Sequence, residues 1–236
     1  MYISLKRRYI QNIFLYLLKT MNLQFKTKEF SLESSSGSGR TFRFVRPSNP
    51  TDVLETITDE QYEKDHFLPY WAETWPSSTV LFEYLTSTLK SSTIKIIEPG
   101  CGLGHLSSVL ASLGHCVTAM DISPVGCKYA LHNIRNNSSG GQVVCCDWRS
   151  LPFKKGYADL LVASDILYEK RWIKPVLSVV KNTVKKEGKA LIADPCRTHW
   201  EDFKREASGK GFNTNVVHTG TVNSGKIVVE ILEIRR

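Results

Sequence analysis

The sequence predicts an α/β domain whose doubly wound, mostly parallel sheet has seven strands, with an accessory β-hairpin before it. First, short apolar runs alternate with segments of helical periodicity from residue 67 to the C-terminus. Second, the run at 94–104 passes from apolar residues to an acid and three glycines. Third, 236 residues with 42% hydrophobic content are enough for one sizeable core and too few for two.

Much of the basic charge lies at the N-terminus. The net charge is +8, and residues 1–20 carry four basic side chains and no acid. The body is therefore only mildly basic, and no arginine-rich run or zinc-finger spacing favours dedicated nucleic-acid binding. The six cysteines form no C-x-x-C pair and have no histidines at ligand spacing, so we expect reduced thiols, a cytoplasmic protein and no metal site.

Residues 1–20 are expected to form a basic extension outside the fold. Their apolar stretch, 13–18, is too short for a transmembrane segment, which needs roughly 20 residues. No small-residue cleavage site follows this stretch, so we do not expect a secretory signal peptide. Two alternatives stay open: a mitochondrial presequence or a membrane-surface helix, and an upstream extension with initiation at Met21.

Residues 21–66 predict an accessory hairpin and a connector. Alternating segments at 25–30 and 41–45 flank a serine- and glycine-rich stretch, which is typical of two strands joined by a flexible loop. The segment 47–63 is polar and interrupted by prolines, and we expect one short helix in it, from Thr58. The principal domain then spans residues 67–236.

The densest aromatic stretch of the chain, 67–78, immediately precedes a helix. Pro76 suits a first helical position, and apolar residues then recur at helical spacing as far as Leu89. Large aromatic residues usually pack in the core. The alternative is that Trp75 and its neighbours wall a cationic ligand through cation–π attraction.

Residues 94–104 predict a buried strand, a tight turn and a helix start, with glycines at positions 100, 102 and 104. A dinucleotide fingerprint has the spacing G-x-G-x-x-G and binds a diphosphate at the helix N-terminus. Here the spacing is G-x-G-x-G, and Glu98 at the strand end would repel a diphosphate and attract an amino group. A cationic nucleoside suits this turn better; a plain tight turn without a ligand is the alternative.

A second acid, Asp121, closes the next predicted strand, 115–121, and lies 23 residues after Glu98. In βαβ nucleotide sites an acid at about this spacing holds the hydroxyls of a ribose. Two acids that close neighbouring strands are more specific than either alone. We therefore predict that Asp121 contacts a ribose.

A helix over 124–136 leads to a third strand that ends at Asp147 and Trp148. This pair suits adenine, with Asp147 accepting a hydrogen bond from the exocyclic amine and Trp148 stacking on the ring. The alternative for Trp148 is to cap the core beside Leu151 and Phe153.

The fourth strand, 159–165, is almost wholly apolar, as a central strand buried on both faces should be. Ligands of open α/β sheets bind outside the carboxyl ends of the strands, so Asp165 and Tyr168 should face the reacting group. The alternative is that Asp165 caps the following helix. The remaining expected elements are a helix from Val176 that ends at Gly188, a strand at 190–194, a helix at 199–210 and strands at 213–218 and 226–234.

Five parts of the sequence together resemble the methyltransferase 16 family of seven-β-strand enzymes. They are Pro69–Pro76, Glu98–Gly104, Asp121, Asp165–Tyr168 and Ala193–Arg197. Within the family, the chain looks most like the electron-transfer-flavoprotein β-subunit lysine methyltransferases and bacterial proteins described as nicotinamide N-methylases. There are two departures. The chain has Glu98-Pro99-Gly100 where the family more often has Asp-Leu-Gly, and Cys196 stands where glycine is common, which bears on the loop after the fifth strand.

The resemblance implies a Rossmann-like class I fold, S-adenosylmethionine as cofactor, and an amine as methyl acceptor. The preferred acceptor is a protein lysine; a small-molecule amine and a non-catalytic binding module are the alternatives. Asp165 would position the amine and Tyr168 would complete that wall. The residues expected to bind the cofactor are Trp75, Glu98, Gly100, Cys101, Gly102, Gly104, Asp121, Ile122, Asp147, Trp148 and Ser164. The acceptor's identity, the degree of methylation and the oligomeric state do not follow from the sequence.

Overall fold

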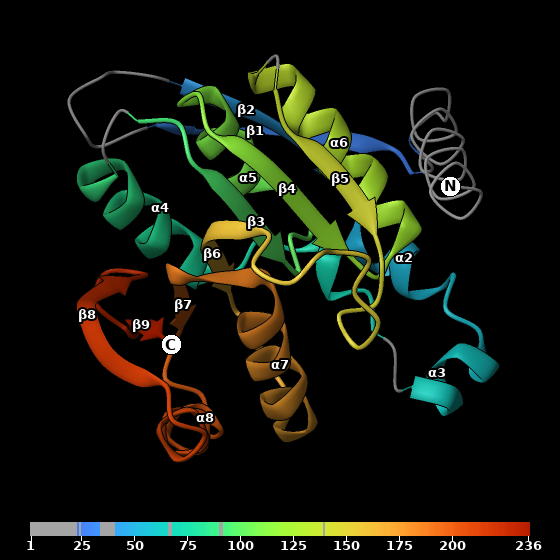
Figure 1. Cartoon of the computed structure of the whole chain (residues 1–236). Coiled ribbons are helices and arrows are strands. Elements are labelled where there is room, and N and C mark those ends of the chain that lie inside the picture. The colour runs from blue at the N-terminus through green and yellow to red at the C-terminus, as the bar shows by residue number, and fades with distance from the viewer. Residues whose placement is uncertain (1–22, 24, 34–40, 66–67, 90–91, 139) are drawn as a thin grey trace, which may run out of the picture.

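A computed structural model describes residues 23, 25–33, 41–65, 68–89, 92–138 and 140–236 of the chain (Figure 1); the basic extension at 1–20 lies outside them. Its main sheet has seven strands in the order β5-β4-β3-β6-β7-β9-β8. The five parallel strands are β3 (Lys95–Pro99), β4 (Cys116–Asp121), β5 (Gln142–Cys145), β6 (Ala158–Ser164) and β7 (Val184–Asp194). The antiparallel end consists of β8 (Asn213–Val222) and β9 (Ile227–Arg235). The predicted fold class is confirmed.

Helices cover both faces of this sheet. One face packs against α4 (Pro76–Thr88), α5 (His105–Ser112) and α6 (Pro124–Asn137), and the other against α7 (Ile173–Thr183) and α8 (Trp200–Gly209). Strand β6 lies at the centre, and its Leu160 and Leu161 point into opposite cores. Because both faces are covered, the strand is apolar throughout, as its sequence predicted.

The accessory hairpin is confirmed and consists of β1 (Thr27–Glu33) and β2 (Thr41–Pro47), paired antiparallel. Phe44 of β2 is fully buried and belongs to the core under α4–α6. On α6, the side chain of Asn133 accepts a hydrogen bond from the Val45 amide at 2.7 Å and donates to the Val45 carbonyl at 2.9 Å. The same amide group donates to the Leu103 carbonyl at 2.8 Å. The hairpin is therefore fixed to α6 and to the glycine turn.

The connector holds two short helices where the sequence predicted one. The helix expected from Thr58 is α3 (Asp59–Asp65), whereas α2 (Pro50–Leu54) was not expected. Five residues are too few for a periodic apolar pattern. The signals that were present are Pro50 at the first helical position and Asn49, whose side chain accepts from the Thr51 amide at 3.2 Å.

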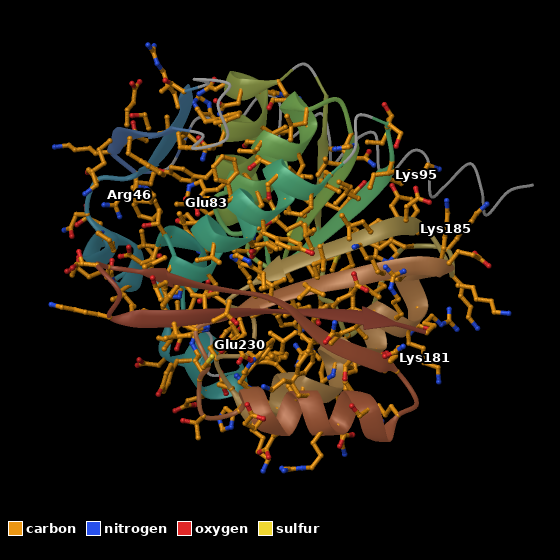
Figure 2. All side chains as sticks on the ribbon, turned by 90° about the vertical axis from the view of Figure 1, so that its left-hand side faces the viewer. Arg46, Glu83, Lys95, Lys181, Lys185 and Glu230 are labelled. Carbon is orange, nitrogen blue, oxygen red and sulfur yellow. The ribbon has the colours of Figure 1, made fainter. Side chains whose placement is uncertain are left out.

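The prediction that the helix from Val176 ends at Gly188 was wrong. Helix α7 ends at Thr183, and β7 begins at once with Val184, which pairs with Ala158. The start of the strand is held by Asp159, whose carboxylate accepts from the Lys185 ammonium at 2.5 Å and from the Lys95 amide at 2.8 Å. Figure 2 shows Lys95 and Lys185 at the same end of the sheet.

Gly188 therefore lies inside a strand, and its role is close packing. A Cβ added at Gly188 would lie 2.6 Å from the Asp159 carbonyl oxygen and 2.9 Å from a methyl group of Val184. Real side chains do not approach so closely, so only glycine lets the two strands meet here.

At the antiparallel end, Glu230 ties β9 to α8 (Figure 2). Its carboxylate accepts from the indole N–H of Trp200 at 2.6 Å and from the Lys204 ammonium at 3.0 Å. Helix α8 agrees with the helix expected at 199–210. Within the described part of the chain, no helix combines the length and apolar character that a membrane span requires.

Replacing Gly188 with alanine is expected to destabilise the protein by about 1–3 kcal/mol, because the added methyl group overpacks β6 and β7. The free energy of unfolding in urea measures this. Gly209→Ala is the matched control, since no atom beyond its chain neighbours and the nearby backbone of α8 lies within 4 Å of the Cβ that it would add. If both variants unfold at the wild-type urea concentration, the packing role of Gly188 is disproved.

Candidate active site

The carboxyl ends of β3, β4 and β6 face a pocket that is completed by two single-turn segments, η1 (Tyr70–Ala72) and η2 (Lys170–Trp172). All the predicted site residues except Gly104 line it. Those residues are Trp75, Glu98, Gly100, Cys101, Gly102, Asp121, Ile122, Asp147, Trp148, Ser164, Asp165 and Tyr168. Gly104 instead lies at the start of α5 with a φ of 75°, and a Cβ there would be 2.9 Å from Cα of Ala130. It allows α5 and α6 to approach each other.

The turn after β3 has the left-handed backbone that its glycines predicted, with φ values of 68° at Gly100 and 50° at Gly102. Protein atoms crowd both glycines. A Cβ at Gly100 would lie 2.8 Å from a methyl group of Ile166, and one at Gly102 would lie 3.3 Å from the Trp71 carbonyl oxygen. The glycines thus permit both the turn and the close packing of the segments around it.

Glu98 ends β3 with a carboxylate that is only 3% exposed. It accepts hydrogen bonds from the Ser107 amide at 2.9 Å and from the Ser107 hydroxyl, both at the start of α5. Burial raises the pKa of Glu98 to about 7, the Ser107 hydrogen bonds oppose the rise, and the nearby charge of Asp121 adds to it. Both protonation states are therefore populated near neutral pH.

Asp121 ends β4 and links the glycine turn to α6. One oxygen accepts from the Gly102 amide at 3.0 Å and the other from the Ser123 amide at 2.9 Å. Burial raises its pKa, against the lowering effect of these backbone donors. A carboxylate has about four acceptor positions, so Asp121 keeps room for further donors such as hydroxyl groups.

Asp147 and Trp148 follow β5 instead of ending it. Asp147 accepts from the amide and the Nε of Arg149, each at 2.7 Å. The ring of Trp148 meets that of Trp172 edge to face, with 5.2 Å between centroids. Trp148 lines the pocket and also packs on the core beside Leu151, which is one of the two roles that the sequence left open; its stacking on adenine stays a prediction.

Asp165 follows β6 at a φ of 59°, and its side chain is 2% exposed. Its carboxylate accepts from the Ser77 amide and hydroxyl, each at 3.1 Å, and from Nη2 of Arg197 at 2.8 Å. Ser77 lies in the first turn of α4, where Trp75 provides no side-chain cap. Asp165 therefore caps α4, and the suggestion that it only caps the following helix was wrong.

Aromatic rings form the wall beside Asp165. The centroid of Tyr70 lies 4.7 Å from that of Tyr168 and 5.9 Å from that of Trp75. Burial raises the pKa of Tyr168, so its hydroxyl stays protonated. Trp75 is held by a hydrogen bond from its indole N–H to the Tyr70 carbonyl at 2.9 Å. Trp75 thus forms part of the pocket wall, and Trp71 both lines the pocket and packs in the core against Tyr129.

The structure brings into or beside the pocket several residues that were not predicted as site residues, among them Tyr70, Ser77, His105, Trp172 and Arg197. The first and last lie in segments that carried the family resemblance, so a signal existed for them. His105 and Trp172 line the pocket, and Nε2 of His105 and Nε1 of Trp172 are buried with no hydrogen-bond partner among the described residues. Burial, reinforced by Arg46, lowers the pKa of His105 to about 4. A bound group could complete the hydrogen bonding of these two nitrogens.

The pocket carries more negative than positive charge. Its lining includes six carboxylates, from Glu73, Glu98, Asp121, Asp147, Asp165 and Glu169, and two guanidinium groups, from Arg171 and Arg197. Such a lining favours a ligand with positive charge. Across the described residues, no group of three or more His, Cys, Asp or Glu side chains is placed to hold a metal ion.

This sheet order, with its pocket at the strand ends and its acids at the ends of β3 and β4, is that of a class I S-adenosylmethionine-dependent methyltransferase. In the comparison with protein families, residues 90–235, well over half of the chain, match the family described as "Methyltransferase domain". The chain belongs to this family. Its cofactor is S-adenosylmethionine.

One curated relative is the ubiquinone biosynthesis O-methyltransferase of Xanthomonas axonopodis pv. citri, 40% identical over 65 residues. The match covers 27% of this chain and 26% of the relative, about a quarter of each. Among solved structures, the magnesium protoporphyrin IX methyltransferase of Synechocystis PCC 6803 superimposes with a TM-score of 0.56 at 15% identity, over 79% of this chain and 97% of that one. A ribosomal protein methylase of Lactobacillus delbrueckii subsp. bulgaricus superimposes with a TM-score of 0.56 at 14% sequence identity, over 70% of this chain and 81% of that one. At these identities the structures share the fold alone.

Replacing Glu98 with glutamine is expected to change how stability depends on pH. The folded-state pKa of Glu98 is raised from 4.5 to about 7, so its contribution to stability is fully present below pH 4.5 and is lost as pH rises through 7. Glutamine has no such proton, and its carbonyl oxygen can still accept from Ser107. Urea unfolding of both proteins at several pH values measures this. The free energy of unfolding of the wild type, relative to that of Glu98→Gln, should fall between pH 4.5 and about 7. A pH-independent difference would contradict the burial argument.

Proposed function

We propose that the methyl acceptor is an amine, in first place the side chain of a protein lysine, and that the chain is a member of the methyltransferase 16 family. The observation that carries this proposal is the wall at the end of β6, where the Asp165 carboxylate lies beside the rings of Tyr70, Trp75 and Tyr168. A carboxylate together with aromatic faces attracts an ammonium group and guides it to the site. An acceptor that never carries a positive charge lacks this electrostatic attraction.

The cofactor assignments remain proposals that the geometry supports. When bound, S-adenosylmethionine supplies an activated methyl group. Glu98 would take its ammonium group, Asp121 the ribose hydroxyls, and Asp147 with Trp148 the adenine. The free acceptor positions on Asp121 and the net negative lining of the pocket support this fit to a cationic nucleoside.

Attack on a methyl group requires the lone pair of the acceptor, and a lysine with a pKa of about 10.4 is mostly protonated at neutral pH. Desolvation of the lysine stem between the rings of Tyr70, Trp75 and Tyr168 would lower that pKa. Asp165 would bind the amine and direct it, and Tyr168 would pack against its stem. The acceleration comes mainly from proximity and orientation, since no strong base is needed once the proton has left.

A small-molecule amine is the second candidate, because the curated relative is named for the biosynthesis of ubiquinone. That match covers only a quarter of each chain and concerns an O-methyltransferase. Its weight is therefore limited to keeping a small acceptor in the experiments.

Incubation of the protein with S-adenosylmethionine labelled in its methyl group and a cell lysate separates these candidates. We expect label in lysate protein, as methylated lysine after acid hydrolysis. Label in small amines alone would favour the second candidate. If the protein binds the cofactor and transfers label to neither fraction, the amine proposal is overturned and a binding module remains.

Replacing Asp165 with asparagine should lower methyl transfer at least tenfold, a loss of about 1.4 kcal/mol of transition-state stabilisation or more, while the dissociation constant of S-adenosylhomocysteine changes little. Asparagine keeps the volume and tolerates the left-handed backbone at this position, but it cannot pair with an ammonium group. Turnover of labelled donor and calorimetry measure the two effects.

Because Asp165 also caps α4, the thermal unfolding of Asp165→Asn must be compared with the wild type. Glu201→Gln, at a side chain that is 76% exposed in the first turn of α8, serves as the control for removal of one carboxylate. Near-normal turnover by a folded Asp165→Asn variant would remove Asp165 from the catalytic residues.

A further inference from the structure

We propose that Arg197 is a positioning residue that keeps the Asp165 carboxylate charged and directed toward the acceptor amine, with Asp194 as the anchor of Arg197. The proposal rests on the amine acceptor proposed above. It concerns a residue in the loop between β7 and α8 that acts through Asp165 and does no chemistry itself.

Arg197 bridges two buried carboxylates. Its Nη2 lies 2.8 Å from Oδ1 of Asp165, and its Nη1 lies 3.0 Å from Oδ2 of Asp194. The backbone amide of Arg197 also donates to Oδ1 of Asp194 at 2.8 Å. Asp194 is fully buried at the end of β7. The guanidinium is thus held at both its backbone and its side chain, and its direction toward Asp165 is set by the fold.

The hydrogen bonds of Asp165 leave room for one more partner. Among the residues that the structure describes, Oδ1 accepts from the Arg197 guanidinium and the Ser77 hydroxyl, and Oδ2 accepts only from the Ser77 amide. Each carboxylate oxygen can accept about two hydrogen bonds. One acceptor position therefore remains on Oδ2 in a carboxylate whose orientation is otherwise fixed from two sides.

The charges of this cluster do not cancel. One guanidinium lies between two carboxylates, which leaves one negative charge for an incoming cation. Arg197 also lies over the ring of Trp75, with 5.8 Å between the guanidinium carbon and the centroid. The same side chain therefore holds both the acid and part of the aromatic wall of the proposed acceptor site.

Arg197 holds down the pKa of Asp165, so its loss would raise that pKa further and favour the protonated acid. Burial raises the pKa of Asp165 to about 6; the Arg197 charge is the first influence against that rise, followed by hydrogen bonds from Arg197 and Ser77, while Asp194 adds to it. Ser77, from α4, carries no charge. Tyr168, on the segment of Asp165 itself, stays neutral because burial raises its pKa. Arg197 is thus the only cation among the groups that act on Asp165 in the described structure.

The direct test measures the protonation of Asp165 without any acceptor. In the full-length protein labelled with ¹³C at the aspartate carboxyl carbon, the Asp165 signal is the one that is lost in Asp165→Asn. Its midpoint should rise by about one pH unit or more in Arg197→Gln, the usual effect of losing a neighbouring arginine. The Asp165 midpoint in Arg197→Lys should lie between those of the wild type and Arg197→Gln, because lysine keeps a positive charge but cannot contact Asp165 and Asp194 through two separate nitrogens. Arg205→Gln, on the exposed side of α8, is the control and should leave the midpoint unchanged.

The functional test is the pH dependence of methyl transfer, with lysate protein as the probe acceptor. The acid limb of the rate profile should move to higher pH in Arg197→Gln by the same amount as the NMR midpoint, so that activity lost at pH 6.5 partly returns at pH 8.5, as expected from a shift of about one unit or more. A merely structural role would lower the rate equally at every pH. If Arg197→Gln fails to fold, Arg197→Lys provides the same comparison with a smaller shift.

The outcomes separate the two proposals. An unchanged Asp165 midpoint, or an unmoved acid limb in a folded variant, overturns the role of Arg197 while methyl transfer to amines by the wild type stands. If the wild-type protein transfers no label to any amine, the amine acceptor is overturned, and the positioning role is lost with it. Matching shifts in both measurements support the inference.

Discussion

The structure depends on keeping four carboxylates buried at the carboxyl ends of parallel strands. Counted over the whole residue, the exposed fractions are 3% for Glu98, 9% for Asp121, 7% for Asp165 and 0% for Asp194. An unpaired charge in such surroundings is costly, so each carboxylate must be met by donors. The donors come from the start of α5, the glycine turn, the start of α4 and the β7–α8 loop. Folding these segments onto the strand ends is what forms the pocket.

This arrangement links stability to the chemistry that the site can perform. Burial raises the pKa of Glu98 to about 7 and that of Asp165 to about 6. Because both acids are buried, their protonation responds to the charge of a ligand that binds beside them. An ammonium group beside either acid would stabilise its charged form and so oppose the effect of burial. A pocket built in this way binds cations more strongly than an exposed acidic surface would, because little water competes with them.

The accessory hairpin contributes to the same end of the sheet. Asn133 joins β2 to α6 and to the glycine turn through a single side chain. The ring of His105 packs edge-on against Phe30 and Phe44 of the hairpin, at 5.1 Å and 4.6 Å between centroids. The hairpin therefore supports the first turn of α5, where Ser107 holds Glu98. Cys196 shows another local adjustment: it takes a φ of 54° where the resembled family commonly has glycine.

The sequence by itself determined the alternation of strands and helices, the glycine turn, and the acids that follow successive strands, because these depend on local periodicity and on short-range turn geometry. Twelve of the predicted site residues line one pocket for that reason. The boundary between α7 and β7 was mispredicted. It depends on contacts with Asp159 of the neighbouring strand β6, which binds Lys185 and packs against Gly188. Only the tertiary structure brings Ser77 and Arg197 to Asp165, across 88 and 32 residues. A residue's own neighbours in sequence carry no signal for such partners, because the energy that selects them is the cost of leaving a charge buried and unpaired.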